Sequence, residues 1–416
     1  MHFKMKIPAL RAKIGNREYY VTTLTFEQVS QNVSRIDEHL HRSQGLKDVI
    51  QRAITDNFTS IKEYILNQPE LFFNSLVLAV FDDYPKWREI EFKYGDTETY
   101  QMGLLEFPVE HKIFPVDGQH IVEGIKAALE ENPELKNQQI GALFIGHIDT
   151  DEGKEKTRRL FTTLNRYAKP VSLRDSIALD EDDIVAICTR NLLEDHNLLT
   201  DNNIVDTKGK AIPRNNNIAF TSIITLYQAN VELFKLYYKE KFDVPPTTKR
   251  IKNYLKFRPE EAEIMAFYEY LNSYWTSITE NTTVLTEYVS EAGVSAEKMR
   301  NNITGGNLLF RPVGLLPFVK ASIELKKRSN FTFNNTFEYF NRKNLILNQE
   351  PWNGIMWDNI GNKMKMGSES IAFLLFLYLY NPEILSETER NKLRDSYAAK
   401  KGIEPDEVFE ELNEVE

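Results

Sequence analysis

Between residues 75 and 167 the sequence alternates short apolar runs with longer stretches of helical spacing, and this alternation constrains the fold more than any other feature. Residues 75–81 (SLVLAVF) and 140–148 (IGALFIGHI) are typical of buried strands. Residues 119–131 follow a helical period that ends before a proline, and a second helix is predicted from about residue 156 to residue 167. Strand, helix, strand and helix in this order predict a compact α/β unit.

Two further apolar runs, GLLEFPV and KIFPV, lie between residues 100 and 116, on either side of Glu110 and His111. They predict a hairpin, or two short strands, leading into Asp117. Upstream, a mixed apolar spacing of three and four predicts a helix from residue 46 up to Pro69.

From Ser172 onward the pattern becomes helical. Ser172 and Asp175 have the spacing of a capping box with Asp in place of Glu. Further helices are predicted at residues 184–193, 220–238, 260–278 and 369–380. The last thirteen residues contain seven carboxylates and predict a solvated helix or tail. We therefore expect an α+β chain, with a mixed α/β core over residues 1–175 and a mainly helical region over residues 176–416.

The overall charge limits any nucleic-acid surface. Lys and Arg total 51 against 61 for Asp and Glu, so the formal net charge is −10. This balance excludes a uniformly basic coat. A local basic face can still bind DNA, because affinity follows the number of phosphates that are neutralised.

The single cysteine, Cys188, excludes intrachain disulfides, cysteine-ligated zinc and iron–sulfur clusters, and it favours a reducing compartment. The N-terminus has no apolar run of signal-peptide length. The longest apolar run, residues 371–380, is about half of a membrane span. We therefore expect a cytoplasmic protein with no membrane partner.

The standard short motifs for nucleotides and zinc are absent from the sequence. It contains no G-x-x-x-x-G-K-[ST] loop, no G-x-G-x-x-G turn, no H-E-x-x-H and no C-x-x-C. The most informative segment is instead residues 114–121 (FPVDGQHI), in which a predicted strand meets a predicted helix through an Asp-Gly turn.

Four residues of this segment, Asp117, Gly118, Gln119 and His120, predict an anion site. Gly118 permits a tight turn or a close approach to a ligand, and the N–H groups of the first helical turn are available to an anion. Asp117 could cap the helix, accept a proton, or hold a divalent cation beside a nucleotide phosphate. The simpler alternative makes Asp117 only an N-cap and His120 only a surface histidine.

The DGQH sequence at 117–120 and the FTTLNRYAKP sequence at 161–170 together resemble the DGQHR-domain family, which includes the DndB proteins of bacterial DNA phosphorothioation systems. Further segments that resemble this family are IPALRAKIGNREYYV near the N-terminus, Gln51-Arg52 with NQPELFF behind it, KAIPRNNNIAFTSIITLYQAN at 210–230 and GGNLLFRPVG at 305–314. The resemblance covers most of residues 7–320.

The resemblance implies a ParB/sulfiredoxin-like core followed by a mainly helical C-terminal region. In such a core a Gly-containing turn between strand and helix holds nucleotide phosphates, so ATP and Mg²⁺ are the implied cofactors. The implied catalytic residues are Asp117, His120 and Asn165, with Asp117 also as the metal ligand, and a weak ATPase would act through this turn. The implied phosphate-binding residues are Arg52, Gly118, Gln119, Arg166 and Lys169.

One position departs from the family motif. The fifth residue of the motif is arginine in the family and Ile121 here, which removes a bidentate phosphate ligand. Arg158, Arg159 or Arg166 could replace it. Ile121 also continues the apolar face that contains Ile125, so a purely structural turn is the alternative.

Basic residues gather near residue 250 and interleave with Tyr254 and Phe257, which predicts a DNA-facing stripe. The stripe consists of Lys249, Arg250, Lys252, Lys256 and Arg258. Residues 326–328 (KKR) form a second basic cluster. The alternative is that both are solvated helix faces, because Glu260, Glu261 and Glu263 directly follow the first cluster.

The remaining polar and aromatic candidates have structural interpretations. The histidines at positions 39, 41, 111, 147 and 196 are expected on the surface, since no third ligand stands at metal-binding spacing. Trp352 and Trp357, with methionines 356, 364 and 366, are expected to pack in a core or an interface.

The resulting hypothesis is a DndB-like component of a bacterial DNA-modification system. It would bind duplex DNA and a nucleotide, regulate the modification genes, act with other proteins of the same operon and form a homo-oligomer. Two alternatives remain open. The chain could be the ATPase-type partner of a transglycosylase that inserts deazaguanine into DNA, or it could be a catalytically silent interaction scaffold.

Overall fold

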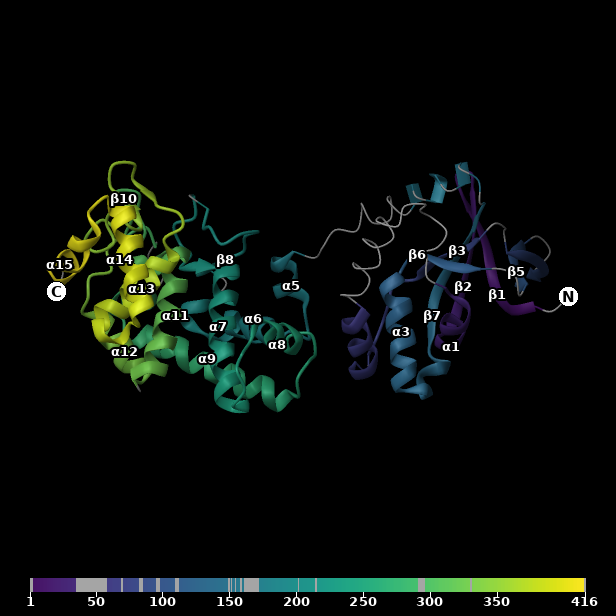
Figure 1. The fold of residues 1–416 in the computed structure, drawn as a ribbon, viewed down its shortest axis with the longest axis horizontal. Helices are drawn as coiled ribbons and strands as arrows, with labels where there is room; N and C mark the ends of the chain where they lie inside the picture. Colours follow the sequence, from purple (N-terminus) through teal and green to yellow (C-terminus); the bar gives the residue numbers. More distant parts are fainter. Residues whose placement is uncertain are drawn as a thin grey trace. The chain divides into compact units, whose positions relative to one another are not determined.

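The computed structural model describes residues 3–34, 58–68, 70–81, 85–94, 98–108, 112–148, 150, 152–153, 155–157, 159–160, 172–200, 202–213, 215–290, 296–329 and 331–414. The chain forms two compact units, Met1–Pro170 and Val171–Glu416 (Figure 1).

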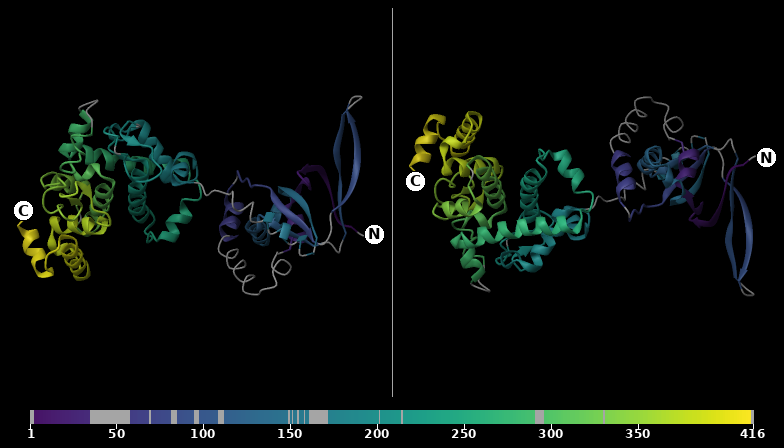
Figure 2. Two further views of the ribbon diagram at one scale, coloured as in Figure 1. Left: turned by 90° about the horizontal axis from the view of Figure 1, so that it is seen from above. Right: turned by 90° about the horizontal axis from the view of Figure 1, so that it is seen from below.

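The first unit is built on a mixed sheet of seven strands. In chain order the strands are β1 (Phe3–Ile14), β2 (Arg17–Thr25), β3 (Leu76–Phe81), β4 (Lys86–Tyr94), β5 (Glu98–Pro108), β6 (Ile113–Asp117) and β7 (Gln139–His147). Their order across the sheet is β4-β5-β1-β2-β7-β3-β6. All neighbours are antiparallel except β3 and β7, which are parallel. The β4–β5 hairpin continues beyond the end of the β1–β5 pairing and projects from the sheet (Figure 2).

Both faces of the central strands are covered. On one face Leu76, Leu78 and Val80 join a core with α1 (Phe26–Asn32), α3 (Gln119–Glu131) and the helical residues 58–67. On the other face Val77 and Ala79 form a smaller cluster with Phe114, Val116, Ile145 and the partly buried Leu160. Burial on both faces explains why β3 is apolar at every position instead of alternating.

The structure confirms the predicted strands near 75–81 and 140–148 and the helix at 119–131. The two strands predicted between residues 100 and 117 are also present, but the hairpin between them is wrong. β5 pairs with β4 and β1, whereas β6 pairs with β3 near the opposite edge of the sheet. β6 leaves β5 because residues 113–116 are buried between the two clusters beside β3.

The second unit is almost entirely helical. Its helices are α5 (Leu173–Leu179), α6 (Ile184–Asp195), α7 (Ile223–Phe242), α8 (Thr248–Tyr254), α9 (Glu261–Glu280), α10 (Thr283–Ser290), α11 (Pro312–Ser329), α12 (Phe333–Asn341), α13 (Glu369–Tyr380), α14 (Glu387–Lys401) and α15 (Val408–Asn413). Two short pairings accompany them, β8 (Ile204–Val205) with β9 (Thr221–Ser222) and β10 (Trp357–Asp358) with β11 (Lys363–Met364). With the sheet of the first unit, this confirms the α+β class.

One large aromatic core holds the second unit together. Trp275, Trp352 and Trp357 are fully buried in it, which confirms the core prediction for the last two. A buried amide joins three helices, because Asn230 on α7 donates to Thr189 Oγ1 on α6 at 2.9 Å and accepts from Trp275 Nε1 on α9 at 2.8 Å. Every polar atom of this junction that is named here is paired, as buried polar groups require.

The predicted helices of the second unit are present, and Ser172 caps α5 by accepting from the N–H of Asp175. The solvated C-terminal helix is wrong in one respect, because Val408 and Leu412 are buried in the aromatic core. In the described residues no helix is long and apolar enough to cross a membrane.

Two of the histidines expected on the surface are buried. His147 shares a 2.7 Å hydrogen bond with Thr157, and His196 accepts the N–H of Leu198 through Nδ1. Each imidazole satisfies a local polar group, which spacing between histidines cannot indicate. Histidines 39, 41 and 111 lie outside the described residues. Of the methionines, 356 is buried but 366 is 75% exposed.

Candidate functional site

The turn between β6 and α3 is shaped by a glycine. Gly118 has a φ of +87°, in the left-handed region, and occupies the N-cap position of α3. A Cβ atom at this position would lie 2.5 Å from Cδ2 of Leu76. Backbone conformation and close packing therefore both require glycine here.

Asp117 is not the N-cap of α3, which corrects the simpler interpretation of this turn. Its Oδ1 atom accepts the N–H of Gly118 at 2.9 Å, and no side chain caps the helix. The side chain of Asp117 is exposed at the end of β6. One carboxylate oxygen thus holds the turn, and Oδ2 has no hydrogen bond to the described residues.

The start of α3 contains polar groups that have no hydrogen-bond partner among the described residues. The first N–H groups of any helix lack intrahelical partners, and the first intrahelical bond here runs from Val122 N to Gly118 O. In addition, Gln119 Nε2 and His120 Nδ1 are buried and have no hydrogen-bond partner in the described part of the chain. Backbone N–H groups without intrahelical partners and two unpaired side-chain nitrogens thus occur in the first turn of one helix, whose positive end favours an anion.

Ile121 belongs to the core side of the helix. It is half-buried and packs against the cluster formed by Val122, Ile125 and the sheet. Helical residues 58–67 pack closely on the same helix, since a Cβ atom on Gly124 would lie 2.5 Å from Ile61 Cγ2. The predicted apolar face of Ile121 and Ile125 is therefore confirmed.

The second half of the predicted site cannot be placed beside this turn. Arg52, Asn165, Arg166 and Lys169 lie outside the described residues, as does Arg158. Arg159 is described, and its exposed guanidinium forms an ion pair with Glu155 at 2.6 Å.

No group of three or more His, Cys, Asp or Glu side chains that could hold a metal is found among the described residues. Asp117 is thus a single carboxylate. Such a group fits Mg²⁺ that is bound mainly by phosphate oxygens and water, because Mg²⁺ commonly uses one or two carboxylates together with its substrate.

The basic stripe lies on and after α8. Lys249, Arg250, Lys252, Lys256 and Arg258 are all exposed, while Ile251 on the opposite side of α8 is buried. Arg250 donates to the carbonyl of Pro245 at 3.1 Å. The stripe therefore includes cationic side chains that face solvent.

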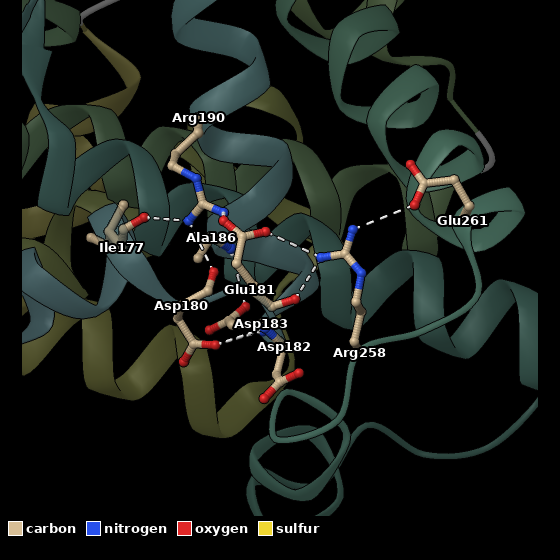
Figure 3. A network of polar contacts seen from close by, with 9 residues as sticks. All are labelled: Ile177, Asp180, Glu181, Asp182, Asp183, Ala186, Arg190, Arg258 and Glu261. Carbon is tan, nitrogen blue, oxygen red and sulfur yellow. Dashed lines mark hydrogen bonds and ion pairs between the residues drawn. The ribbon is translucent and has the colours of Figure 1, made fainter. Parts of the chain in front are cut away.

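The charge of Arg258 is already paired within the second unit. It donates to the backbone carbonyl of Glu181 at 2.7 Å and to the carboxylates of Glu181 and Glu261 at 3.2 and 3.4 Å (Figure 3). Arg190 approaches the same Glu181 carboxylate at 2.6 Å. The acidic run at 180–183 was visible in the sequence, but nothing in its spacing indicated that it would meet Arg258.

The loop that binds Arg258 is itself fixed by Asp183, the N-cap of α6 (Figure 3). Asp183 accepts the N–H groups of Val185 and Ala186 and the hydroxyl of Tyr227, the last at 2.6 Å. Burial raises the pKa of the Asp183 carboxyl despite these bonds. This network is structural, since all its polar atoms named here have partners within the unit.

The second basic cluster, residues 326–328, is also paired. Lys326 contacts Glu240 at 3.1 Å, and Arg328 contacts Glu389 at 2.8 Å. The Arg328 hydrogen bond lowers the pKa of Glu389 to about 2. Lys327 pairs with Glu324 at 3.4 Å. The described contacts therefore favour a structural role for this cluster.

Comparisons with known proteins agree with the motifs. A family model described as DndB, DNA-sulfur modification-associated, matches residues 7–377. No curated protein and no solved structure gives a match, so the ParB/sulfiredoxin-like core stays a prediction. Because the family match covers most of the sequence, the chain belongs to the DndB family and is a component of a DNA-sulfur modification system.

Proposed function

We propose that this DndB-family chain binds a nucleotide through its phosphates at the turn formed by residues 117–120, binds duplex DNA, and thereby regulates the genes of the modification system. The observation that carries the nucleotide proposal is the unpaired state of Gln119 Nε2 and His120 Nδ1 at an uncapped helix start. A buried polar group without a partner costs about 1–3 kcal/mol, and a phosphate at this turn would remove that cost.

The proposed roles follow from the geometry of the turn. Phosphate oxygens would accept from the first N–H groups of α3, from the Gln119 amide and from His120. Asp117 would share Mg²⁺ with the phosphates through its Oδ2 atom. Gly118 would supply the left-handed backbone conformation that this turn requires. Asn165 and Lys169 would complete the site.

We propose binding, and not rapid hydrolysis, as the main activity of this turn. Stabilising the charge of a transferring phosphoryl group usually requires a guanidinium or a comparable cation. Ile121 occupies the position where the family has arginine, and it packs against the core. The nucleotide would then act as a signal that changes DNA binding.

Duplex DNA would contact the solvent-facing part of the basic stripe, Lys249, Arg250, Lys252 and Lys256. Arg258 is not included, since its guanidinium is bound to Glu181 and Glu261. Because DNA affinity depends on local phosphate neutralisation, this small surface can act within a chain whose net charge is −10. DNA-dependent regulation and homo-oligomer formation are part of the same proposal.

The test is calorimetric titration of the full chain with ATP and Mg²⁺, with ATP hydrolysis measured in parallel. We expect binding by the wild type and by Glu130→Ala, a control at the exposed end of α3. His120→Ala and Gln119→Met should each weaken binding roughly tenfold, because each removes one buried hydrogen bond to an anion.

Ile121→Arg sharpens the result. If the wild type binds ATP and Ile121→Arg binds it more tightly, the turn is a nucleotide site that tolerates isoleucine. A folded wild type that shows no binding while Ile121→Arg binds would contradict the proposal for this chain. Equal binding by the wild type, His120→Ala and Gln119→Met would also contradict it, since the nucleotide would then lie elsewhere.

A further inference from the structure

A cavity of about 480 Å³ lies in the first unit, away from the turn at residues 117–120. It is lined by residues of the β1–β2 turn, the end of β7 and the segment that follows β7. Val77 on β3 lies opposite both Asp117 on β6 and Leu143 on β7, whereas the cavity begins two residues further along β7, at Ile145. The two sites are therefore separated along the strands of the same sheet.

The most informative group in this cavity is Arg17, the first residue of β2. Arg17 lines the cavity, and its Nη1 atom is buried without a hydrogen-bond partner in the part of the chain that the structure describes. A buried guanidinium nitrogen without an acceptor is unfavourable, and no ion pair to a described carboxylate offsets its charge. An anionic ligand would supply the missing acceptor.

The other lining groups restrict the kind of anion. Lys156 adds a second cation, and its ion pair with Glu152 at 2.7 Å is largely exposed. Glu18 and Thr150 also line the cavity. Glu18 Oε1 already accepts the Tyr20 hydroxyl at 2.6 Å, so the second carboxylate oxygen of Glu18 and the Thr150 hydroxyl are the groups that can bind a ligand hydroxyl. The cavity is thus lined by both cationic and carboxylate side chains. This combination suits a ligand that has an anionic group and also hydroxyl groups.

The cavity also has an apolar wall. Ile14, Ile145 and Ile148 line it, so a carbon ring would have a surface to pack against. Two of the lining residues, His147 and Thr157, are joined by a 2.7 Å hydrogen bond between Nδ1 and Oγ1. Its volume lies within the range of about 300–1,000 Å³ that is typical of small-molecule sites.

We propose that this cavity binds a small phosphate monoester that carries hydroxyl groups, such as a nucleoside monophosphate or a sugar phosphate. The phosphate contacts Arg17 and Lys156, and the hydroxyl groups contact Glu18 and Thr150. The ring packs on the three isoleucines. This site is independent of the nucleotide proposed at residues 117–120, and each can fail without the other.

The experiment titrates the full chain with AMP, ribose 5-phosphate and inorganic phosphate, by calorimetry and by the shift of Tm. We expect AMP or ribose 5-phosphate to bind more tightly than inorganic phosphate. Tighter AMP binding identifies a nucleotide ligand, and equal binding of AMP and ribose 5-phosphate identifies a sugar phosphate. Arg17→Met should weaken the binding at least tenfold, roughly the effect of losing a charge-assisted hydrogen bond.

Arg17→Met also separates a binding role from a structural one. Methionine replaces the unbranched stem of the arginine side chain and has no donor that must be paired, so the ligand-free variant should melt at the wild-type Tm or above it. An arginine that holds the fold would instead lower Tm when replaced. His120→Ala should leave this binding unchanged, which distinguishes the cavity from the other site.

Lys13→Met is the matched control, because Lys13 is an exposed cation in the same hairpin, opposite Glu18, and does not line the cavity. It should bind like the wild type. The proposal is overturned if no probe binds to the folded wild type, or if Arg17→Met binds as well as Lys13→Met. A loss of Tm in ligand-free Arg17→Met would also overturn it.

Discussion

Two regions of the molecule differ in how their buried polar groups are paired, namely the junction of α6, α7 and α9 in the helical unit and the two candidate ligand sites in the sheet unit. At the junction in the helical unit, the buried side chains of Asn230 and Asp183 are bonded to partners within the same unit. In the sheet unit, Gln119, His120 and Arg17 each have a buried nitrogen without a described partner. Buried polar atoms without a described partner also occur in the helical unit, among them Thr221 Oγ1, Thr282 Oγ1 and Trp357 Nε1, so an unpaired atom alone does not identify a site. At the two candidate sites of the sheet unit we interpret the unpaired nitrogens as groups that a ligand would satisfy.

The largest contrast should come from replacing one amide in each unit by an apolar side chain of similar size. Asn230→Leu leaves the Trp275 indole without its acceptor and removes the donor to Thr189 Oγ1, which keeps its own bond to the Val185 carbonyl, and we expect the free energy of unfolding to fall by about 3 kcal/mol. Gln119→Met removes an amide nitrogen that is already unpaired, so stability should stay within about 0.5 kcal/mol or rise. Urea denaturation of both variants measures the difference, and equal losses would remove the contrast.

Glycines in the left-handed region offer the next comparison. Gly118→Ala adds a clash with Leu76 to the backbone strain, and we expect a loss of about 3 kcal/mol. Gly402→Ala, at the end of α14, meets open space and should lose only about 1 kcal/mol from strain. Thermal unfolding of the two variants gives both values. A smaller loss at Gly118 would show that Leu76 moves aside easily.

Acid should destabilise the helical unit through His196. Burial lowers the pKa of His196 to about 4, below its usual value of about 6.5 in an unfolded chain. The unfolded chain therefore binds the proton more readily than the folded chain does. The free energy of unfolding is accordingly unaffected by His196 above pH 6.5 and decreases as the pH falls towards 4. Between pH 7 and pH 4 the wild type should lose about 3 kcal/mol more than His196→Gln, as measured by urea denaturation. Parallel losses in the two proteins would contradict this assignment.

The smallest expected effect concerns DNA binding. It tests whether the exposed lysines of the basic stripe bind DNA while the paired Arg258 does not. The double variant Lys249→Gln with Lys252→Gln should weaken duplex binding about tenfold. It should also reduce the slope of log affinity against log salt concentration by roughly two. Arg258→Gln should bind DNA like the control Lys392→Gln, because the Arg258 charge is already paired. Fluorescence anisotropy at several salt concentrations measures both. A strong effect of Arg258→Gln would mean that DNA displaces Glu181.

Much of the secondary structure could be predicted because it depends on local spacing. The apolar face of residues 119–131 and the run at 75–81 were identified from their own residues alone. β1, β2 and β4 were not predicted, because polar residues alternate along them, as the burial pattern of β2 shows. The candidate turn was predicted from Gly118 and its neighbours, but not Leu76, whose contact makes glycine necessary.

By itself, the sequence determined the α+β class, the turn at residues 117–120 and, through its motifs, membership of the DndB family. Only the tertiary structure decided that β6 pairs with β3, that Glu181 neutralises Arg258, and that Arg17 lines a cavity with an unpaired nitrogen. The reason is physical. Periodicity and turn chemistry act over a few residues, whereas strand partners, ion pairs and cavities depend on contacts between residues that lie far apart in the chain.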